Sequence, residues 1–458
     1  MSFPLKRQIY EAIPLPLKRV ACSMPFSWLA GKQYRQTFRR RVWFDMAQRQ
    51  ELRTYQETEL GKLLSFAVGK VPAYKHLRSV VEQYRPFEAL NEFPIVQKDD
   101  VQNRQADFLP DSFDEIPHYE TATGGTSGNQ LKIFLDDGSQ SVEMAFMHRQ
   151  WARVGYAPSK RKATFRGVPF RNLRPEIYWQ DNPVYNERQF SPFHMSERNL
   201  PAYVAALTEF RPEYIHGYPS AIDTLAEYLL RTRSSAPFPP IVAVLLGSEG
   251  VTLGQRERIE RAFRARVYSW YGHSERVVLA GECEVSSSYH HFPDYGVLEI
   301  VDDEGNPCNR EGDRGEIVGT GLLNYCMPLI RYRTGDHATR LESSCECGRN
   351  WDRFCDVEGH RKQEMVITKG GGKISLAALN MHGDVFAEVV RFQYQQDVPG
   401  MCTLRIVPSP GFAEGDLRRI HDAFRDKVGH ELDIDIRLVE EIPLTARGKL
   451  KMLVSSLS

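Results

Sequence analysis

The sequence predicts an α/β protein with more than one domain. From about residue 200 the chain alternates short apolar runs with amphipathic segments, which is typical of strands and helices in a doubly wound sheet. Beyond about residue 290 the pattern changes to strands joined by turns. We therefore expect a large N-terminal domain with mixed or parallel sheets flanked by helices plus a β-rich lobe. A small, mobile α+β domain is expected to follow at the C-terminus.

The individual elements follow from periodicity and from the residues that begin or end helices. Apolar positions between Phe44 and Gly69 predict one long amphipathic helix that Gly69 and Pro72 close. The basic run 39–41 before it is expected on a solvated helix face. Ser220 and Thr252 are predicted N-caps. The other predicted helices are 201–210, 221–230 and 253–263, and the predicted strands are 213–216, 241–246, 266–270, 296–302 and 315–320.

A loop rich in glycine and hydroxyl side chains occupies residues 121–129, Thr-Ala-Thr-Gly-Gly-Thr-Ser-Gly-Asn. Glycines allow backbone N–H groups to surround an anion, and hydroxyl groups add hydrogen-bond donors, so the loop suits a phosphate. A strand within 130–135 is expected to leave it. Taken alone, such a cluster is more often a turn. The Gly-Lys-Ser/Thr ending of a P-loop is absent, so the sequence does not support the mechanism of the P-loop NTPases.

Composition excludes several classes of partner. Lys plus Arg number 59 and Asp plus Glu also number 59, so neither nucleic acid nor an anionic membrane surface is an expected partner. No apolar run approaches the roughly 20 residues of a membrane span, and no secretory signal is evident. Eight cysteines are too sparse for a disulfide scaffold in a chain of 458 residues. We expect a cytoplasmic protein that binds small molecules.

Clustered cysteine and histidine residues predict a structural zinc site. Cys345 and Cys347 form a tight pair, and Cys283 is followed by a pair of histidines at 290 and 291. Three thiolates and one imidazole make a closed tetrahedral set. The expected ligands are Cys283, His290, Cys345 and Cys347, with His290 favoured over His291. Cys355 is an alternative ligand, and packing of the cysteines as small apolar groups is the alternative interpretation.

Six motifs occur in a consistent order along the chain. They are the 121–129 loop, Gly247–Glu249, Tyr271–Glu275, Tyr332–Asp336, Gly359–Arg361 and Pro443–Lys449. In this order they resemble the acyl-adenylate-forming superfamily. Three further segments are similar to the phenylacetate-CoA ligase-like branch, especially to proteins encoded with capsular-polysaccharide genes: Ile215–Ser220, Met327–Tyr332 and Leu379–His382. The resemblance extends from about residue 50 onward.

The resemblance implies a two-step reaction. A carboxylate attacks the α-phosphorus of ATP to give acyl-AMP and pyrophosphate, and an acceptor, expected to be coenzyme A, then displaces AMP. Because two anions must meet, catalysis rests on positioning and charge neutralisation. The residues that would wrap the ATP phosphates are Thr123, Gly124, Gly125, Thr126, Ser127 and Gly128. Those that would face the adenine are Ser248, Glu249 and Gly250.

The remaining motifs receive roles from the same resemblance. Within Tyr271–Gly272–His273, Tyr271 would offer its ring to the purine. Ser274 would donate to the α-phosphate or the carboxylate, and Glu275 would bind magnesium. Asp336 suits the ribose hydroxyls, with a turn aspartate as its alternative interpretation. Lys449 would bridge the carboxylate and the α-phosphate, and Lys451 is its neighbouring rival.

The domain boundary is expected near Gly359–Gln363. Residues 1–360 would form the adenylation domain, and residues 361–458 would form a lid that carries Lys449 and rotates for the second half-reaction. This chain has Gly359–His360 where the family usually has Gly-Arg. Arg361 would have to make the nucleotide contact instead, and whether His360 impairs it stays open.

Several questions stay open at the level of sequence. The acceptor can be coenzyme A, a carrier-protein thiol, an amine or a sugar, so an acyl-adenylate-dependent amide or acyl transferase for polysaccharide or natural-product decoration is the first alternative. A noncatalytic nucleotide- or partner-binding module is the second. The resemblance makes a homodimer reasonable and adds support for zinc, because some members of the branch carry it. The acid itself is not specified by any motif.

Overall fold

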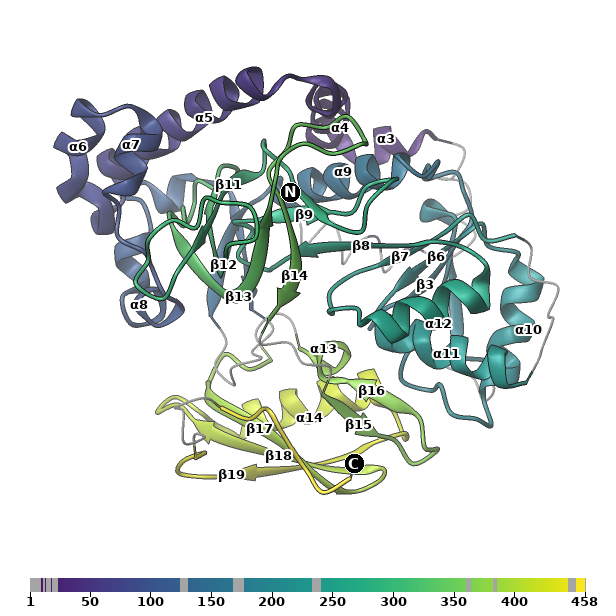
Figure 1. Cartoon of the computed structure of the whole chain (residues 1–458). Coiled ribbons are helices and arrows are strands. Elements are labelled where there is room, and N and C mark those ends of the chain that lie inside the picture. Colours follow the sequence, from purple (N-terminus) through teal and green to yellow (C-terminus); the bar gives the residue numbers. More distant parts are fainter. Residues whose placement is uncertain are drawn as a thin grey trace.

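The computed structural model describes residues 10, 13, 18, 24–123, 131–167, 177–232, 240–359, 364–381, 385–443 and 450–457. Three parts follow one another in Figure 1: a group of helices at the N-terminal end, a long sheet with helices against it, and a smaller sheet at the C-terminal end. This mixed α/β architecture is the predicted fold class. The loop residues 124–130, the junction residues 360–363 and residues 444–449 lie outside the described part of the chain.

The N-terminal region is helical. Its helices are α3 (Phe26–Leu29), α4 (Gly31–Met46), α5 (Arg49–Lys70), α6 (Arg78–Gln83), α7 (Pro86–Asn91) and α8 (Lys98–Asn103), with 3-10 turns at Pro72–Leu77, Gln105–Phe108 and Phe113–Glu115. The prediction of one helix from Phe44 onward was wrong at its start. The chain is extended at Ala47 and Gln48, and the Gln48 N–H donates to the Glu51 carboxylate at 2.7 Å. This capping box begins a second helix, α5.

A twelve-stranded sheet forms the centre of the molecule, in the order β11-β12-β13-β14-β10-β9-β8-β7-β6-β3-β5-β4. Strands β5, β3, β6, β7 and β8 are parallel neighbours. The bounds in this half are β3 (Lys162–Phe165), β4 (Trp179–Asn182), β5 (Glu187–Phe190), β6 (Tyr214–Gly217), β7 (Ala243–Leu246) and β8 (Val267–Gly272), with a 3-10 turn at Pro183–Tyr185. Its helices are α9 (Ser139–Ala152), α10 (Leu200–Phe210), α11 (Pro219–Arg231) and α12 (Leu253–Phe263).

The other half of the sheet is antiparallel and corresponds to the predicted β-rich lobe. It contains β9 (Leu279–Gly281), β10 (Tyr289–His291), β11 (Gly296–Val301), β12 (Arg314–Gly321), β13 (Tyr332–Leu341) and β14 (Arg353–Glu358). A separate hairpin, β1 (His118–Ala122) and β2 (Lys132–Asp136), flanks the glycine-rich loop. Tyr119, Leu131 and Ile133 of this hairpin region belong to the same hydrophobic cluster as Val277 and Ala280. The hairpin therefore packs with the antiparallel lobe.

Burial on both faces explains why the parallel strands are continuous apolar runs in the sequence. All four residues of β3, β6 and β7 are buried, because helices cover both faces of a parallel sheet. Helix α11 buries Ile222, Leu225 and Leu229, spaced three and four residues apart, as an amphipathic helix requires. In Figure 1, α11 and α12 lie together in front of β3 and β6.

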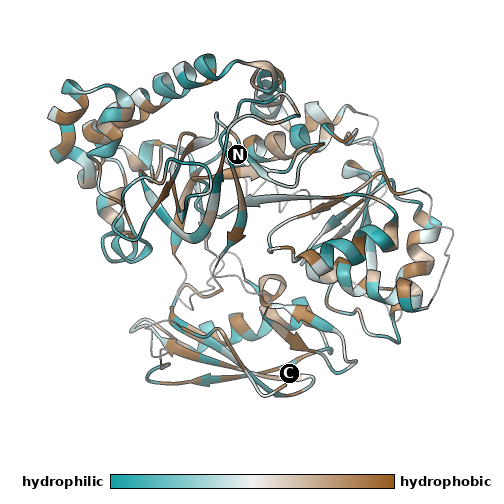
Figure 2. Cartoon of the chain, viewed as in Figure 1, coloured by the Kyte–Doolittle hydropathy of each residue, from teal (hydrophilic) through white to brown (hydrophobic). Residues whose placement is uncertain are grey.

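The C-terminal part has its own four-stranded sheet, ordered β19-β18-β17-β20. Its elements are β15 (Met365–Ile367), β16 (Lys373–Ser375), α13 (Leu376–Leu379), β17 (Val389–Val398), β18 (Met401–Pro408), α14 (Glu414–Val428), β19 (Asp433–Leu438) and β20 (Leu453–Ser455). Helix α14 buries Ile420, Phe424 and Val428 and shows both brown and teal residues in Figure 2. The predicted boundary near residue 360 and the predicted mobility of this part stay predictions.

A hydrophobic cluster connects this C-terminal part to the parallel half of the large sheet. Val366, Ile374 and Ala378 belong to the same buried cluster as Phe193 and Tyr218. Close backbone approach accompanies this packing, because a Cβ atom on Gly372 would lie 3.0 Å from the Met195 carbonyl oxygen. The structure therefore describes the C-terminal part in contact with the face that carries the strand ends of β3 and β6.

Two local predictions were wrong. Ser220 lies inside the first turn of α11, and Tyr218 occupies the N-cap position. Arg41 was expected in solvent, but it is fully buried and forms an ion pair with Asp294. Its guanidinium also lies 4.3 Å from the ring centre of Phe146. A charge-only pattern could not show that a carboxylate and aromatic faces from distant segments enclose this side chain.

Of the helices in the described ranges, none has both the length and the apolar character that crossing a lipid bilayer requires.

Candidate functional site

Several predicted motifs meet at the carboxyl ends of the parallel strands. The registers pair Phe165 with Gly217, Gly217 with Leu246, and Leu246 with Ser269, so β3, β6 and β7 end side by side and β8 continues past them to Gly272. The motif Gly247–Gly250 follows β7 directly, and Tyr271–Glu275 includes the end of β8. In open α/β sheets ligands bind at this edge. The candidate site is therefore located here.

Tyr271, Asp336 and Gly359 come together from three separate motifs. The Tyr271 hydroxyl donates to Oδ2 of Asp336 at 2.9 Å. Asp336 lies on β13 rather than in a turn, contrary to its alternative interpretation. A Cβ atom on Gly359 would lie only 2.2 Å from Oδ1 of Asp336, so the chain passes directly against this carboxylate. The absence of a side chain at Gly359 leaves Asp336 free to keep this orientation.

Glu275 lies between a tyrosine and a lysine. The Tyr332 hydroxyl donates to Oε1 of Glu275 at 3.1 Å. Lys98 begins α8, which is held beside β13 because the Val96 N–H donates to the Arg331 carbonyl at 2.9 Å. Burial lowers the pKa of Lys98, while the negative charge of Glu275 opposes that shift. Burial and the neighbouring Glu275 raise the pKa of Tyr332, so the tyrosine stays a neutral donor.

The side chains of the Gly247–Gly250 motif after β7 form hydrogen bonds with other residues of the protein. Glu249 accepts hydrogen bonds from the Ser220 N–H and hydroxyl, both at 3.1 Å, and from the Ser375 hydroxyl of the C-terminal part. Burial raises the pKa of Glu249, and these hydrogen bonds counteract the shift. Ser248 has a positive φ of 69° and accepts a hydrogen bond from Arg166 at 2.8 Å. The side chain of Glu249 is thus committed to serines from two parts of the chain, although the motif was predicted to face adenine.

The structure describes some of the remaining predicted residues and not others. The Thr123 N–H donates to the Leu131 carbonyl at 2.9 Å, and the Leu131 N–H donates to the Thr123 hydroxyl at 2.9 Å. These two bonds close the base of the glycine-rich loop. Neither ring nitrogen of His273 has a hydrogen-bond partner within the described ranges. Of the other predicted residues, Gly124, Gly125, Thr126, Ser127, Gly128, Arg361 and Lys449 lie outside the described residues.

Sequence analysis missed three polar neighbours of the site. Arg166 directly follows the buried strand β3, and its position at a strand end was the signal that could have identified it. His216 received no role from the segment Ile215–Ser220, yet its Nε2 lies 3.5 Å from Nη1 of Arg166. No feature of the sequence indicated that Lys98 belongs to the site. Helix α8 is far from Glu275 in sequence and comes near it only because Val96 pairs with Tyr332 of β13.

A second group of predicted residues converges on the antiparallel lobe. Ligand atoms of Cys283, His290, Cys345 and Cys347 all lie within 4.8 Å of one another. The sulfur atoms of Cys283 and Cys345 are 3.9 Å apart, and the sulfur of Cys347 is 3.5 Å from Nε2 of His290. Tetrahedral zinc with ordinary bond lengths places two sulfurs about 3.8 Å apart and a sulfur and a nitrogen about 3.6 Å apart. The four donors therefore fit zinc.

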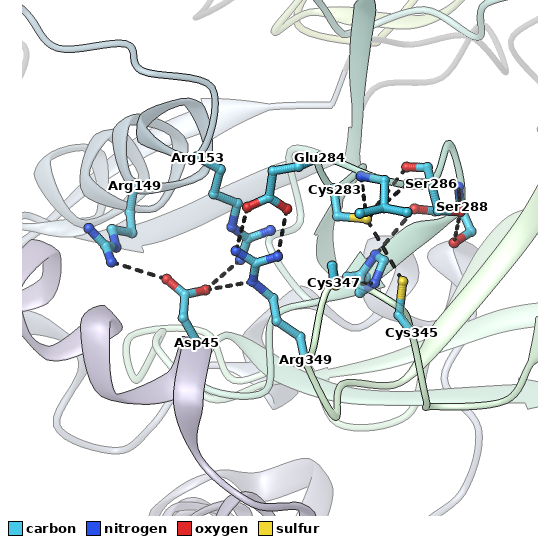
Figure 3. Close-up of polar contacts among 12 residues, drawn as sticks. Asp45, Arg149, Arg153, Cys283, Glu284, Ser286, Ser288, Cys345, Cys347 and Arg349 are labelled. Atoms are coloured by element: carbon cyan, nitrogen blue, oxygen red, sulfur yellow. Dashed lines mark hydrogen bonds and ion pairs between the residues drawn. The ribbon is translucent and has the colours of Figure 1, made fainter.

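The surroundings of this cluster orient its donors (Figure 3). The N–H groups of Val285 and Ser286 donate to the Cys283 sulfur at 3.4 and 3.1 Å, which favours a thiolate. Nδ1 of His290 lies 3.3 Å from the Ser288 carbonyl and donates to it, so Nε2 is the ring nitrogen that faces the Cys347 sulfur and is available to a metal. Burial opposes ionisation of the Cys347 thiol, but its hydrogen bond with His290 lowers the pKa to about 5.

The alternatives considered for the cluster lie apart from it. His291 is buried, its pKa is lowered to about 4 by burial, and its side chain is not part of the group of four. The Cys355 thiol donates to Asp356 at 3.2 Å. Side-chain alternation along β10 explains why His290 belongs to the cluster and His291 does not, because adjacent residues of a strand point to opposite faces of the sheet.

A buried ionic network adjoins the cluster. Arg349 donates to both oxygens of Glu284 at 2.7 and 2.8 Å and to Asp45 at 3.0 Å. Asp45 also pairs with Arg153 at 2.9 Å and with Arg149 at 3.2 Å. Figure 3 shows Asp45 of α4 between arginines of α9 and of the cysteine-containing loop. The network thus ties the N-terminal helix to the segments that carry the predicted metal ligands.

A cavity of about 120 Å³ is lined in part by Arg276, the residue that follows the Tyr271–Glu275 motif. Arg276, Glu143 and Tyr295 contribute to its lining. Arg276 pairs with Glu143 at 3.8 Å and donates to the Gln140 side chain at 3.0 Å, while the Tyr295 hydroxyl donates to Glu143 at 2.8 Å. Arg276 and Glu143 are therefore satisfied within the cavity, and Asp136, which also lines it, accepts from the N–H groups of Tyr325 and Cys326.

Comparison with known proteins identifies relatives over most of the chain. The model of the CapK C-terminal domain matches residues 366–456. Protein CapK of Staphylococcus aureus is 22% identical over 390 residues, which cover 80% of each chain. Phenylacetate-coenzyme A ligase of Thermus thermophilus is 27% identical over 334 residues, which cover 70% of this chain and 73% of the ligase.

Solved structures show the same fold. 2-Hydroxyisobutyryl-CoA ligase in complex with 2-HIB-AMP and CoA, in the thioesterification state, aligns with a TM-score of 0.58 over 90% of this chain and 91% of its own, at 16% identity. The same ligase in the postadenylation state aligns with a TM-score of 0.56 at 17% identity. The predicted resemblance and the predicted fold class are therefore confirmed.

Proposed function

Because this chain is homologous to CapK and to phenylacetate-CoA ligases and shares the fold of adenylate-forming ligases, we propose that it activates a carboxylic acid with ATP. In the first step a carboxylate oxygen bonds to the α-phosphorus, the bond to pyrophosphate breaks, and acyl-AMP forms. In the second step an acceptor attacks the acyl carbon, and AMP leaves with the oxygen that came from the acid. We favour coenzyme A as the acceptor, because the ligase relatives are named as coenzyme A ligases.

One observation carries this proposal: residues from separate motifs converge beside the end of β8. Tyr271, Glu275, Tyr332 and Asp336 are joined by two hydrogen bonds, although they come from two segments about sixty residues apart. An uncharged phenol next to each carboxylate fixes its direction. Asp336 would accept hydrogen bonds from the two ribose hydroxyls, since an ionised carboxylate is only an acceptor.

Glu275 is the residue that we propose as the magnesium ligand. Hard oxygen donors suit this ion, which binds through one or two carboxylates together with substrate phosphates. When bound, magnesium neutralises part of the phosphate charge. Lys98 would add a second positive charge near Glu275, whose negative charge acts on it, and this lysine would help to neutralise the phosphates of ATP. The glycine-rich loop that begins at Thr123 would supply backbone donors to the same phosphates.

Cys283, His290, Cys345 and Cys347 are proposed to hold a structural zinc ion. Four protein donors leave no open coordination position, so the ion would not take part in the reaction. When bound, zinc would fix β9, β10 and the loop before β14 relative to one another. This would support the strand ends from which the Tyr271–Glu275 motif projects.

A second acceptor class has a specific observation in its favour. The C-terminal part matches the CapK C-terminal domain, and CapK is similar over 80% of this chain. The name CapK suggests a role in capsular-polysaccharide synthesis, for which transfer of the acyl group to a sugar or an amine would be a suitable second step. Acyl transfer assays with coenzyme A, amines and sugars as competing acceptors would separate the two possibilities.

Replacing Lys449 by alanine is expected to reduce acid-dependent exchange of pyrophosphate into ATP by roughly a hundredfold to a thousandfold. The side chain would place a point charge between the carboxylate and the α-phosphate as negative charge builds. The matched control is Lys451→Ala, because Lys451 is an exposed lysine two residues away. Equal loss in both variants, or none in either, would contradict the assignment. ATP binding without exchange on any acid would favour a noncatalytic binding module.

Gly359→Ala is expected to raise the KM for ATP by roughly tenfold or more with little change in the melting temperature. The new methyl group would meet Oδ1 of Asp336 at 2.2 Å and force this carboxylate away from Tyr271. Losing a hydrogen bond to a charged group has an effect of this size. The measurement is the ATP dependence of pyrophosphate exchange.

Gly69→Ala is the control for the glycine substitution, because Gly69 lies on α5 outside every predicted motif. A Cβ atom at this position meets nothing within 4 Å, so the variant tests whether an added methyl group is harmful in itself. An unchanged KM for ATP in Gly359→Ala would show that Asp336 does not bind the nucleotide in the orientation described.

A further inference from the structure

Arg166 differs from the other partly or fully buried arginines of the protein. Arg41, Arg188, Arg256 and Arg331 each form an ion pair with at least one carboxylate. Within the described ranges, no carboxylate lies within ion-pair distance of the Arg166 guanidinium. Its described partners are uncharged: Nη2 donates to the Ser248 hydroxyl at 2.8 Å, and Nη1 lies 3.5 Å from Nε2 of His216.

The two partners direct the guanidinium toward the strand ends. Nδ1 of His216 lies 2.8 Å from the Leu245 carbonyl and must donate to it, so Nε2 is an acceptor that faces Arg166. Burial lowers the pKa of His216 well below its usual value, and the charge of Arg166 adds to this shift, so the histidine stays neutral. The guanidinium also lies 5.3 Å from the ring centre of Tyr218. Arg166 is therefore fixed by three uncharged groups.

Among the described residues, this arrangement brings no carboxylate into ion-pair contact with the positive charge of Arg166 at the ligand edge of the sheet. Arginine stays protonated in proteins, and withdrawing its charge from water is unfavourable unless an anion is supplied. Glu249 interacts electrostatically with Arg166, but its two oxygens accept hydrogen bonds from Ser220 and Ser375. An anionic ligand would supply the negative charge that the described residues do not place against this guanidinium.

The sheet order separates Arg166 from the residues proposed to bind the ATP phosphates. Arg166 follows β3, and β6 and β7 lie between β3 and β8, whose end carries the motif with Glu275. The ring of Tyr218 lies next to the guanidinium and would contact an organic substrate held there. The planar guanidinium fork matches the two oxygens of a carboxylate.

We propose that Arg166 binds a second carboxylate of the acid that this protein activates, so that its substrates are dicarboxylic acids. This inference rests on the proposed function. One carboxylate would react with ATP while the other, paired with Arg166, would hold the acid in register along the strand ends. Monocarboxylic acids of the same length would leave the arginine unpaired and be activated less well.

The experiment compares pairs of acids that differ by one carboxylate, for example homophthalate with phenylacetate, and aliphatic diacids with monoacids of equal length. Acid-dependent pyrophosphate exchange gives kcat/KM for each. The wild-type protein is expected to favour the diacid of a pair by roughly tenfold or more. Arg166→Met should remove this preference by lowering kcat/KM for diacids alone, and Arg166→Lys should restore part of it.

Arg261→Met is the matched control, because Arg261 is an exposed arginine on α12. Melting temperatures and calorimetric ATP binding establish that each variant is folded. A wild-type preference for monoacids, or an equal loss for both acids in Arg166→Met, would overturn the inference while leaving acid activation intact. A rise in the KM for ATP with every acid would assign Arg166 to the nucleotide and also overturn it. Absence of exchange with every acid would instead refute the proposed function.

Discussion

Glu275→Gln is expected to lower pyrophosphate exchange about a hundredfold or more and to raise the magnesium concentration needed for half-maximal rate. The substitution keeps the size of the side chain and its hydrogen bond with Tyr332, but it removes the negative charge. Magnesium binds through such a carboxylate, and removing one preorganised electrostatic contact costs a factor of this order. Exchange measured over a range of magnesium concentrations tests the prediction.

Tyr332→Phe is the companion variant for this experiment. It removes the 3.1 Å hydrogen bond to Oε1 of Glu275 and leaves the carboxylate charged. We expect a smaller loss, of roughly tenfold, because the hydroxyl acts only by directing Glu275. A Glu275→Gln protein that exchanges at the wild-type rate with the same magnesium dependence would contradict the proposed role of this residue.

Cys345→Ser is expected to abolish stoichiometric zinc binding and to lower the free energy of unfolding by roughly 4 kcal/mol or more, the range in which loss of a metal site falls. Its thiolate is one of four donors in a closed set, and three donors cannot hold the segments together as tightly. Metal analysis of protein purified without added zinc and chemical denaturation provide the two measurements.

Cys355→Ser is the control for the metal experiment. This cysteine is in the same lobe, but its thiol contacts Asp356 and not the cluster. It should keep about one zinc per chain and a near-normal stability. Wild-type protein with no bound zinc, or equal stability of Cys345→Ser and wild type in the absence of a chelator, would contradict the proposed zinc site.

The motifs that follow strands were the part of the site that sequence could predict. Tyr271–Glu275 follows a buried strand, and the carboxyl ends of neighbouring parallel strands must meet at one edge. The spacing of Cys345 and Cys347, and of Cys283 and His290, likewise brought four donors within 4.8 Å of one another. Such features are local, so a single sequence carries them.

Contacts that depend on the packing of distant segments were not predictable. Arg41 meets Asp294 across 253 positions, and Arg349 meets Asp45 across 304 positions. Nothing in the run 39–41 distinguishes the buried arginine from its exposed neighbours. The position of Lys98 beside Glu275 depends on pairing between Val96 and Tyr332, and the use of Glu249 by Ser375 depends on how the C-terminal part packs. Periodicity and composition contain no information on such pairings.

The most direct test of the account follows the oxygen atoms of the acid. Activation as acyl-AMP requires that one carboxylate oxygen be transferred to AMP when the acceptor takes the acyl group. With an acid labelled in its carboxylate by ¹⁸O, mass spectrometry of the products should find one labelled oxygen in AMP and none in pyrophosphate. Label in inorganic phosphate together with ADP, or turnover of ATP without transfer of label to AMP, would contradict acyl-adenylate formation.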